Sequence, residues 1–335
     1  AELFLHPGMQ HVLLGAFADL EQAGDQVIFT THSPFMLQAD LSTINLVRKN
    51  ANCGTQVIEF HEVLAQEDSS TMNRLLQIQN VSSYLFADRV LLVEGVSDRI
   101  VLRKLATKLK PEWDFHQCGI PVLPVTGKGD LPLFKSFLES LEIAPFIVTD
   151  IGAVRTTIER LCTGDGQEAI KQAKNRLCEH ARELAEMGEF QPRINKGYAE
   201  KLASGYRWRD VFNNLEDLYL ALTEGDEYTD EHLGCFEKLL LKRYDDAERT
   251  ALQCDRDSIC DLRRELKRLL LGEGVLLLSG DIEDYYPSGS STAKVKSALA
   301  FDPEEHEPEE IRACFVALGD TTDVEAFFHR LFEVE

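Results

Sequence analysis

Residues 90–105, VLLVEGVSDRIVLRKL, decide how this chain folds. The first four residues form an apolar run rich in branched side chains, which predicts a strand buried on both faces. Glu94 ends this run, and Asp98 follows it by one helical turn. Ligands of open α/β sheets bind at this end of the strands. A helix is predicted next, because apolar residues recur on one side at Val96, Ile100, Leu102, Leu105 and Leu109.

Two later stretches repeat the order of apolar strand and acid. Residues 145–150, PFIVTD, end on Asp150, and residues 275–283, VLLLSGDIE, carry Asp281 and Glu283. Parallel strands in one sheet would bring their carboxyl ends together, so we expect all five carboxylates to share one crevice. Such a cluster repels itself unless cations bind, and oxygen ligands suit Mg²⁺ or Mn²⁺. Taken by itself, Glu94 has an alternative interpretation: it would be a loop carboxylate that interacts with the positive end of the helix dipole and not a metal ligand.

The elements between these acids predict an α/β fold. A strand over 120–125 and a helix over 133–141 separate the first two acidic strands. Strands that alternate with helices indicate a doubly wound, mostly parallel sheet with flanking helices. The loop TGKGD, residues 126–130, has two interpretations. Its backbone and Lys128 approach a phosphate, or it is an ordinary strand–helix connection.

Composition limits the class of protein. A length of 335 residues predicts roughly two domains. The eight cysteines form no C-x-x-C pair, which argues against a zinc ribbon or a disulfide framework and favours a reduced, cytoplasmic protein. No apolar run is long enough to cross a bilayer, so we expect no membrane partner. The net charge of −22 governs solubility and does not exclude a local nucleic-acid site.

The first 62 residues resemble the end of an ABC-type ATPase lobe. The resemblance rests on ELFLHP at 2–7 and THSP at 31–34, and it implies a γ-phosphate sensor at His32. No G-x-x-x-x-G-K-[ST] motif occurs, so we expect no ATP to bind this chain alone and a turn or capping role for His32. We expect the C-terminal part of a longer protein whose ATPase domain is a partner. The elements predicted up to the first acidic strand are helices over 10–20, 35–37 and 72–86 and strands over 27–30, 44–47 and 56–60.

A second resemblance covers about residues 1–152 and 274–300. VLLVEGVSD, TGKGD, FIVTD and LSGDIEDYY, in this order, resemble the Toprim domain of OLD-family (overcoming lysogenisation defect) nucleases. The family implies DNA cleavage with two Mg or Mn ions. It implies a phosphate-contacting role for Lys294, with Lys296 as the rival. The metal ligands that it implies are Glu94, Asp98, Asp150, Asp281 and Glu283.

The resemblance suggests a mechanism and one departure. Glu94, Asp98 and Asp150 are assigned to one metal. Asp150, Asp281 and Glu283 are assigned to the other, with Asp150 bridging the two ions. Lys294 would stabilise charge on the scissile phosphate.

Gly152 stands where the family's D-x-D motif has its second acid, which leaves the metal stoichiometry open. It also favours the alternative function, a non-catalytic metal- and partner-binding regulatory module of an ATPase. A third candidate function, the passage of DNA strands as in topoisomerases, would need a nucleophilic tyrosine. Tyr285 and Tyr286 lie close to the predicted site, but they are predicted to be packing residues.

The expected domains are an ATPase remnant (1–62), the first part of Toprim (63–152), a helical insert (153–273) and the second part of Toprim with C-terminal helices (274–335). The insert is either a DNA-gripping lid, with the triplet Arg207-Trp208-Arg209 as a contact, or a structural or dimer-forming bundle. Its alternating charges slightly favour the bundle, and a homodimer is left open. Helices are predicted over 169–187, 198–222, 231–271, 309–318 and 322–332.

Overall fold

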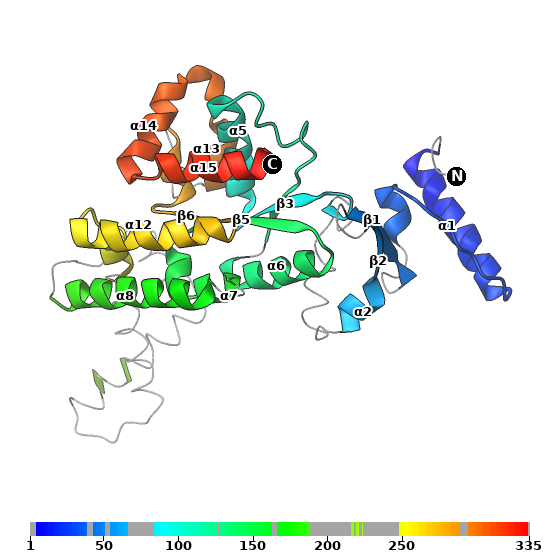
Figure 1. Ribbon diagram of the computed structural model, residues 1–335, viewed down its shortest axis with the longest axis horizontal. Coiled ribbons are helices and arrows are strands. Elements are labelled where there is room, and N and C mark those ends of the chain that lie inside the picture. The colour runs from blue at the N-terminus through cyan, green and yellow to red at the C-terminus, as the bar shows by residue number, and fades with distance from the viewer. Residues whose placement is uncertain are drawn as a thin grey trace. The chain divides into compact units, whose positions relative to one another are not determined.

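A computed structural model describes most of the chain (Figure 1). The residues that lie outside the described part of the chain include 72–83 of the predicted helix over 72–86, nearly all of the prediction over 198–222, and 231–247 of the prediction over 231–271. The triplet Arg207-Trp208-Arg209 lies outside that part too. The described residues are 5–38, 43–50, 54–65, 84–125, 127–162, 166–187, 216–217, 219–220, 223, 248–287 and 294–333.

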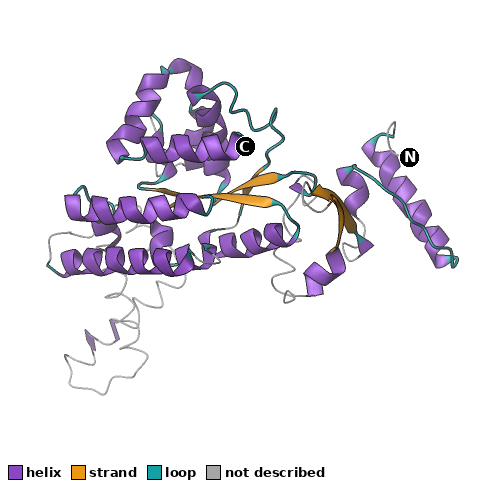
Figure 2. Cartoon of the chain, in the orientation of Figure 1, coloured by secondary structure: helices purple, strands orange, loops and turns teal. Residues whose placement is uncertain are grey.

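The chain divides into two compact units. The first comprises residues 1–148 and 326–335, and the second comprises residues 149–325. Figure 2 shows that the strands form two sheets and that helices make up most of the rest of the described chain. None of the described helices is both long enough and apolar enough to span a membrane.

The larger sheet confirms the predicted α/β fold. Its strands are β3 (Arg89–Val93), β4 (Val122–Pro124), β5 (Ala144–Asp150) and β6 (Val275–Leu278), in the order β4-β3-β5-β6. Strand β3 pairs in parallel with both β4 and β5. The apolar residues of β3 are fully buried, as a strand covered on both faces requires. The helices that follow these strands in the first unit are α5 (Val96–Leu109) and α6 (Leu131–Ser140), with the 3₁₀ turn η3 (Lys128–Asp130) before α6.

Helix α5 forms where it was predicted, but its buried face differs. Val101, Leu102 and Leu105 are buried, whereas Val96 is half exposed. The prediction placed Val96 and Ile100 on the apolar side. Val96 occupies the first turn of the helix, in which the neighbouring Ser97 is the buried residue. The core therefore lies about one residue further round the helix than spacing alone indicates.

The N-terminal elements match the prediction except for one strand and for a helix over residues 60–65 that was not predicted. Helix α1 (Pro7–Gln22) and the 3₁₀ helix η1 (Pro34–Gln38) form as expected. An antiparallel pair, β1 (Asn45–Asn50) and β2 (Gly54–Glu59), precedes helix α2 (Phe60–Ala65). The predicted strand over 27–30 is wrong, because these residues pair with no described strand. Ile28 is 84% exposed, so its apolar side chain has no sheet face to pack against.

The second unit is built largely from helices. Helices α8 (Gln167–Glu186) and α12 (Asp257–Gly272) pack against each other through apolar faces that include Leu177 and Leu266. The described residues of the predicted insert are mostly helical, as expected. The shorter elements are the 3₁₀ helix η4 (Ile151–Arg155), α7 (Ile158–Leu161), η5 (Ile282–Tyr285) and α13 (Lys294–Ala300).

The tail forms the predicted pair of helices after a 3₁₀ turn, η6 (Pro303–Glu305). Helix α14 (Pro308–Leu318) begins on a proline, whose fixed φ suits the first helical position. Gly319 ends it with a φ of 72°, a left-handed conformation that favours glycine. Helix α15 (Thr321–Phe332) follows, and its residues from Ala326 onward belong to the first unit. There the ring of Phe327 lies 5.8 Å from that of Phe146 in β5.

Candidate metal centre

Glu94 and Asp98 lie at the carboxyl end of β3, in the first unit. The amide of Gly95 donates to Oδ2 of Asp98 at 2.7 Å, so Asp98 caps the start of α5. Nζ of Lys128 lies 3.6 Å from Oε2 of Glu94, and both side chains are largely buried. The TGKGD loop therefore directs its lysine at one of the acids that we predict to bind metal.

Asp150 and Asp281 meet on one arginine in the second unit. Asp150 ends β5, and Asp281 comes three residues after β6. Nη2 of Arg249 lies 2.9 Å from Oδ1 of Asp281 and 3.9 Å from Oδ2 of Asp150. Arg249 belongs to a short helical segment, residues 248–252, that precedes α12. The fold thus brings two acids that are distant in sequence to a single cation.

Gly152 contacts the acid of its own motif through its backbone. Its amide donates to Oδ1 of Asp150 at 2.6 Å. This backbone contact orients Asp150 and would be available to any residue at position 152, so it does not replace the side-chain oxygen that the family pattern has there.

Glu283 is the most buried of the predicted ligands. Its side chain is 3% exposed, and Oε2 accepts from Nζ of Lys294 at 2.9 Å. Oε1 is also buried, and no described residue donates to it. Lys296, the rival lysine, is exposed and forms no ion pair with a described residue. Lys294, and not Lys296, therefore contacts the acidic loop, by which we mean residues 279–285.

The three acids of the second unit do not form one preassembled ligand group. Among the described residues, Asp150, Asp281 and Glu283 do not bring three oxygens within 4.8 Å of one another. Arg249 lies against two of these acids and Lys294 against the third. The residues nevertheless fit a hard divalent cation. All are carboxylates, and the buried Oε1 of Glu283, to which no described residue donates, is an oxygen that a divalent cation would satisfy.

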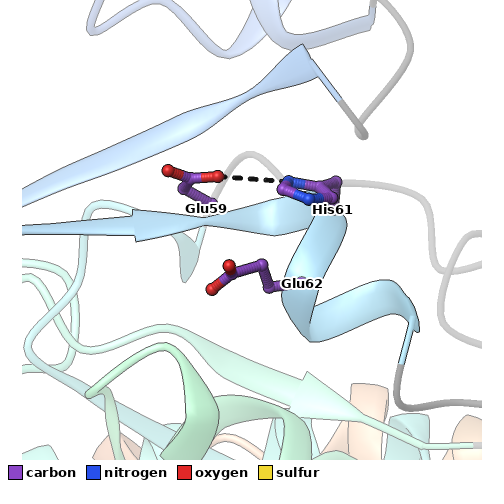
Figure 3. Close-up of side chains that lie close together, drawn as sticks. All are labelled: Glu59, His61 and Glu62. Atoms are coloured by element: carbon purple, nitrogen blue, oxygen red, sulfur yellow. Dashed lines mark ion pairs between the residues drawn. The ribbon is translucent and has the colours of Figure 1, made fainter.

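A separate acidic group at the end of β2 was not predicted. Figure 3 shows Glu59 facing His61, with Oε2 3.3 Å from Nδ1, and Glu62 beside them on the first turn of α2. The ligand atoms of the three side chains lie within 4.8 Å of one another. All three residues are exposed, and exposed acids gather in this way without an ion. We therefore assign no metal to them.

Sequence reasoning missed Arg249 and a buried acid, Asp320. Asp320 lies between α14 and α15, where it interacts with Lys267, Ser279 and Tyr285. Burial lowers the pKa of Lys267, and the nearby carboxylate of Asp320 opposes that effect. The only sequence signal for Asp320 is its place after Gly319, which is also typical of an ordinary helix cap.

The aromatic residues of the acidic loop pack as predicted. Tyr285 and Tyr286 are both buried, and the hydroxyl of Tyr286 donates to Oγ of Ser297 at 3.0 Å. Burial raises the pKa of Tyr285 well above its usual value, which opposes a role as a nucleophile. His32 is exposed, with its ring 5.7 Å from that of Phe86.

Comparison with known proteins gives consistent matches. Residues 85–151 match the family described as overcoming lysogenization defect protein-like, TOPRIM domain. The chain is 31% identical over 154 residues to the Old nuclease of Escherichia phage P2, a match that covers 44% of this chain and 26% of that protein. It is 31% identical over 159 residues to the OLD nuclease of Thermus scotoductus, covering 44% of this chain and 28% of that protein.

A third relative is the endonuclease GajA of Bacillus cereus. It is 31% identical over 116 residues, covering 34% of this chain and 19% of that protein. The chain thus spans about a quarter of the length of the curated relatives that it matches.

Proposed function

We propose that this chain is the metal-dependent DNA-cleaving part of an ATPase–nuclease, because residues 85–151 match the OLD-like TOPRIM family. The observation that carries the proposal is the meeting of Asp150 and Asp281 on Arg249. From two acids that follow different strands and contact one cation we infer a metal site, since carboxylates are the ligands that hard divalent cations prefer. The names of the relatives, OLD nuclease and endonuclease GajA, support the same class of reaction.

The proposed metal ligands come from three strand ends. Val93 pairs with Val148 in the parallel β3–β5 ladder, and in the chain Glu94 comes one residue after Val93 and Asp150 two residues after Val148. We keep the assignment of Glu94, Asp98 and Asp150 to one ion and of Asp150, Asp281 and Glu283 to the other. Mg²⁺ or Mn²⁺ would supply an activated water and would offset charge on the phosphate.

In this proposal, two cations of the second unit, Arg249 and Lys294, first hold the acids and then bind DNA. Arg249 and Lys294 hold Asp281 and Glu283 in place by neutralising them. Both cations are half exposed, at 42% and 46%, and each can turn from its carboxylate towards a phosphate oxygen of DNA. Lys294 is assigned to the scissile phosphate and Arg249 to the flanking backbone.

The proposal also covers the N-terminal residues, the helical insert and the location of the protein. Residues 1–62 are proposed to be the end of an ABC-type ATPase lobe, with the rest of that ATPase domain as the partner of this chain. The insert over 153–273 is proposed to be either a bundle or a DNA grip. We propose a cytoplasmic protein, since the cysteines of the described residues are free thiols, as a reducing compartment favours. The second candidate function is a non-catalytic regulatory module. Gly152 favours it, because the motif then offers one acid fewer to a metal.

Cleavage of supercoiled plasmid tests the proposal. The purified chain is incubated with plasmid in Mg²⁺, Mn²⁺ or EDTA, beside Glu94→Gln and Asp281→Asn. We expect nicked and linear products that need metal and disappear in both variants, because each loses a charged metal ligand. Glu62→Gln, in the exposed group of Figure 3, is the matched control and should cut like the unmodified protein. If cleavage persists in Asp281→Asn, the ligand assignment is wrong.

The absence of cleavage needs a second measurement. Binding of Mn²⁺ is then measured by calorimetry in the unmodified chain and in Asp281→Asn. Metal binding that depends on Asp281 without cleavage would favour the regulatory module.

A further inference from the structure

Asp320 is a fully buried acid whose hydrogen-bonding positions are all occupied. It lies between α14 and α15, and its side chain is 0% exposed. Oδ1 accepts from the ammonium of Lys267 and from Oγ of Ser279, the latter at 3.0 Å. Oδ2 accepts from the amide of Ser279 at 2.9 Å and from the hydroxyl of Tyr285. Four donors therefore serve the roughly four acceptor positions of one carboxylate.

These contacts hold both ends of the acidic loop. Ser279 follows β6, and Tyr285 ends η5. Asp281 and Glu283 lie between them. The hydroxyl of Tyr285 also accepts from the amide of Gly280 at 3.2 Å, which closes the loop on itself. One carboxylate thus fixes the two ends of the segment that carries two of the proposed ligands.

Stability alone does not account for such an arrangement. A buried ion pair contributes little to folding beyond what apolar side chains of the same volume supply. The pair of Lys267 and Asp320, at 4% and 0% exposure, is buried in this sense. Its other contacts go to the loop and not to the surrounding apolar core. Groups that hydrogen-bond to metal ligands tune the affinity of the site, and Asp320 acts one step further out, through the residues at the two ends of the loop.

We propose that Asp320 is a positioning residue that holds the loop of residues 279–285 in the conformation from which Asp281 and Glu283 bind metal. Asp320 itself touches neither metal nor DNA. Lys267 supplies the opposite charge that allows the carboxylate to remain buried. The inference rests on the proposed function, since it needs a metal at Asp281 and Glu283.

Asp320→Asn in the full chain tests the inference. The amide nitrogen of Asn cannot accept from two donors, so one end of the loop is released. We expect Mn²⁺ affinity, measured by calorimetry, to fall by about tenfold. Without added metal, hydrogen exchange at the amides of Ser279 and Gly280 should become faster, because each donates within this network. Tyr285→Phe removes a single hydroxyl and should give a smaller loss of the same kind, which keeps the test valid if Asp320→Asn does not fold.

Two controls separate positioning from simple destabilisation. Leu177→Ala leaves a cavity between α8 and α12 without touching the loop, so it should lower Tm while Mn²⁺ affinity stays unchanged. If Asp320→Asn lowers Tm but leaves Mn²⁺ affinity and loop exchange unchanged, Asp320 is merely structural and the inference is overturned. Asp281→Asn is the reference variant. If it binds Mn²⁺ normally, the proposed metal centre fails, and the positioning role fails with it.

Discussion

The ion pair between Lys294 and Glu283 allows a quantitative prediction. Lys294→Met keeps most of the side-chain length and removes the charge. Glu283 is then left as a 3% exposed carboxylate whose Oε1 already lacks a described donor. A hydrogen bond to a charged group contributes about 1.5–3 kcal/mol. Because the ammonium of Lys294 is 46% exposed, solvent screens part of that value, and we take about 2 kcal/mol.

This loss of free energy should be visible in thermal unfolding. For the second unit, residues 149–325, a loss of about 2 kcal/mol in the free energy of unfolding corresponds to a fall in Tm of about 4–8 °C. The fall should be greatest in EDTA. In saturating Mn²⁺ the gap between variant and unmodified protein should narrow, because the metal replaces the missing cation at Glu283 and need not displace a lysine.

Differential scanning calorimetry in EDTA and in Mn²⁺ is the assay. Lys296→Met is the matched control, since Lys296 lies two residues along the same helix, is exposed and pairs with no described acid. The control should shift Tm by less than about 1 °C, as surface substitutions do. Equal shifts in both variants, or a gap that Mn²⁺ does not narrow, would refute the reasoning.

Three further predictions concern other contacts. Arg249→Ala should raise Mn²⁺ affinity about two- to fivefold in calorimetry, because an exposed pair contributes only about 0.2–1 kcal/mol and metal no longer competes with it; weaker binding would contradict this. Trp113→Ala should reduce the free energy of unfolding by about 3–5 kcal/mol in urea titrations, since the buried indole packs on α15; a loss below about 1 kcal/mol would exclude that packing role. Lys267→Met should reduce the free energy of unfolding by a similar amount, because it leaves the buried carboxylate of Asp320 without its opposite charge. Adding Asp320→Leu should recover part of that loss in the same titrations. If Lys267→Met is more stable than the unmodified protein, the ion pair does not have this role.

Local patterns predicted the framework well. Strand β3 and helix α5 follow from a short branched run and from helical spacing, which are properties of neighbouring residues. The acids at the strand ends follow from the same stretches. The strand over 27–30 was wrong because an apolar run becomes a strand only if a partner pairs with it, and the partner is not encoded locally.

The contacts that surround the acids could not be predicted in this way. Arg249 reaches Asp281 from a helical segment of the insert, and Asp320 reaches Ser279 from the tail. Neither residue stands near the acids in sequence, and neither has a distinctive motif. Charge patterning marks Arg249 as one more cation on a helix surface, so its role is visible only in three dimensions.

The contacts of Asp320 with Ser279 and Tyr285, which together clamp the two ends of the acidic loop, also have a consequence during protein synthesis. Ser279 and Asp320 are separated by 41 positions in the chain. At about 5–20 residues per second, a ribosome needs roughly 2–8 s to travel that distance. Throughout that interval the nascent loop has been translated but lacks its clamp. The order of translation therefore makes completion of the acidic loop one of the later events in the biosynthesis of the second unit.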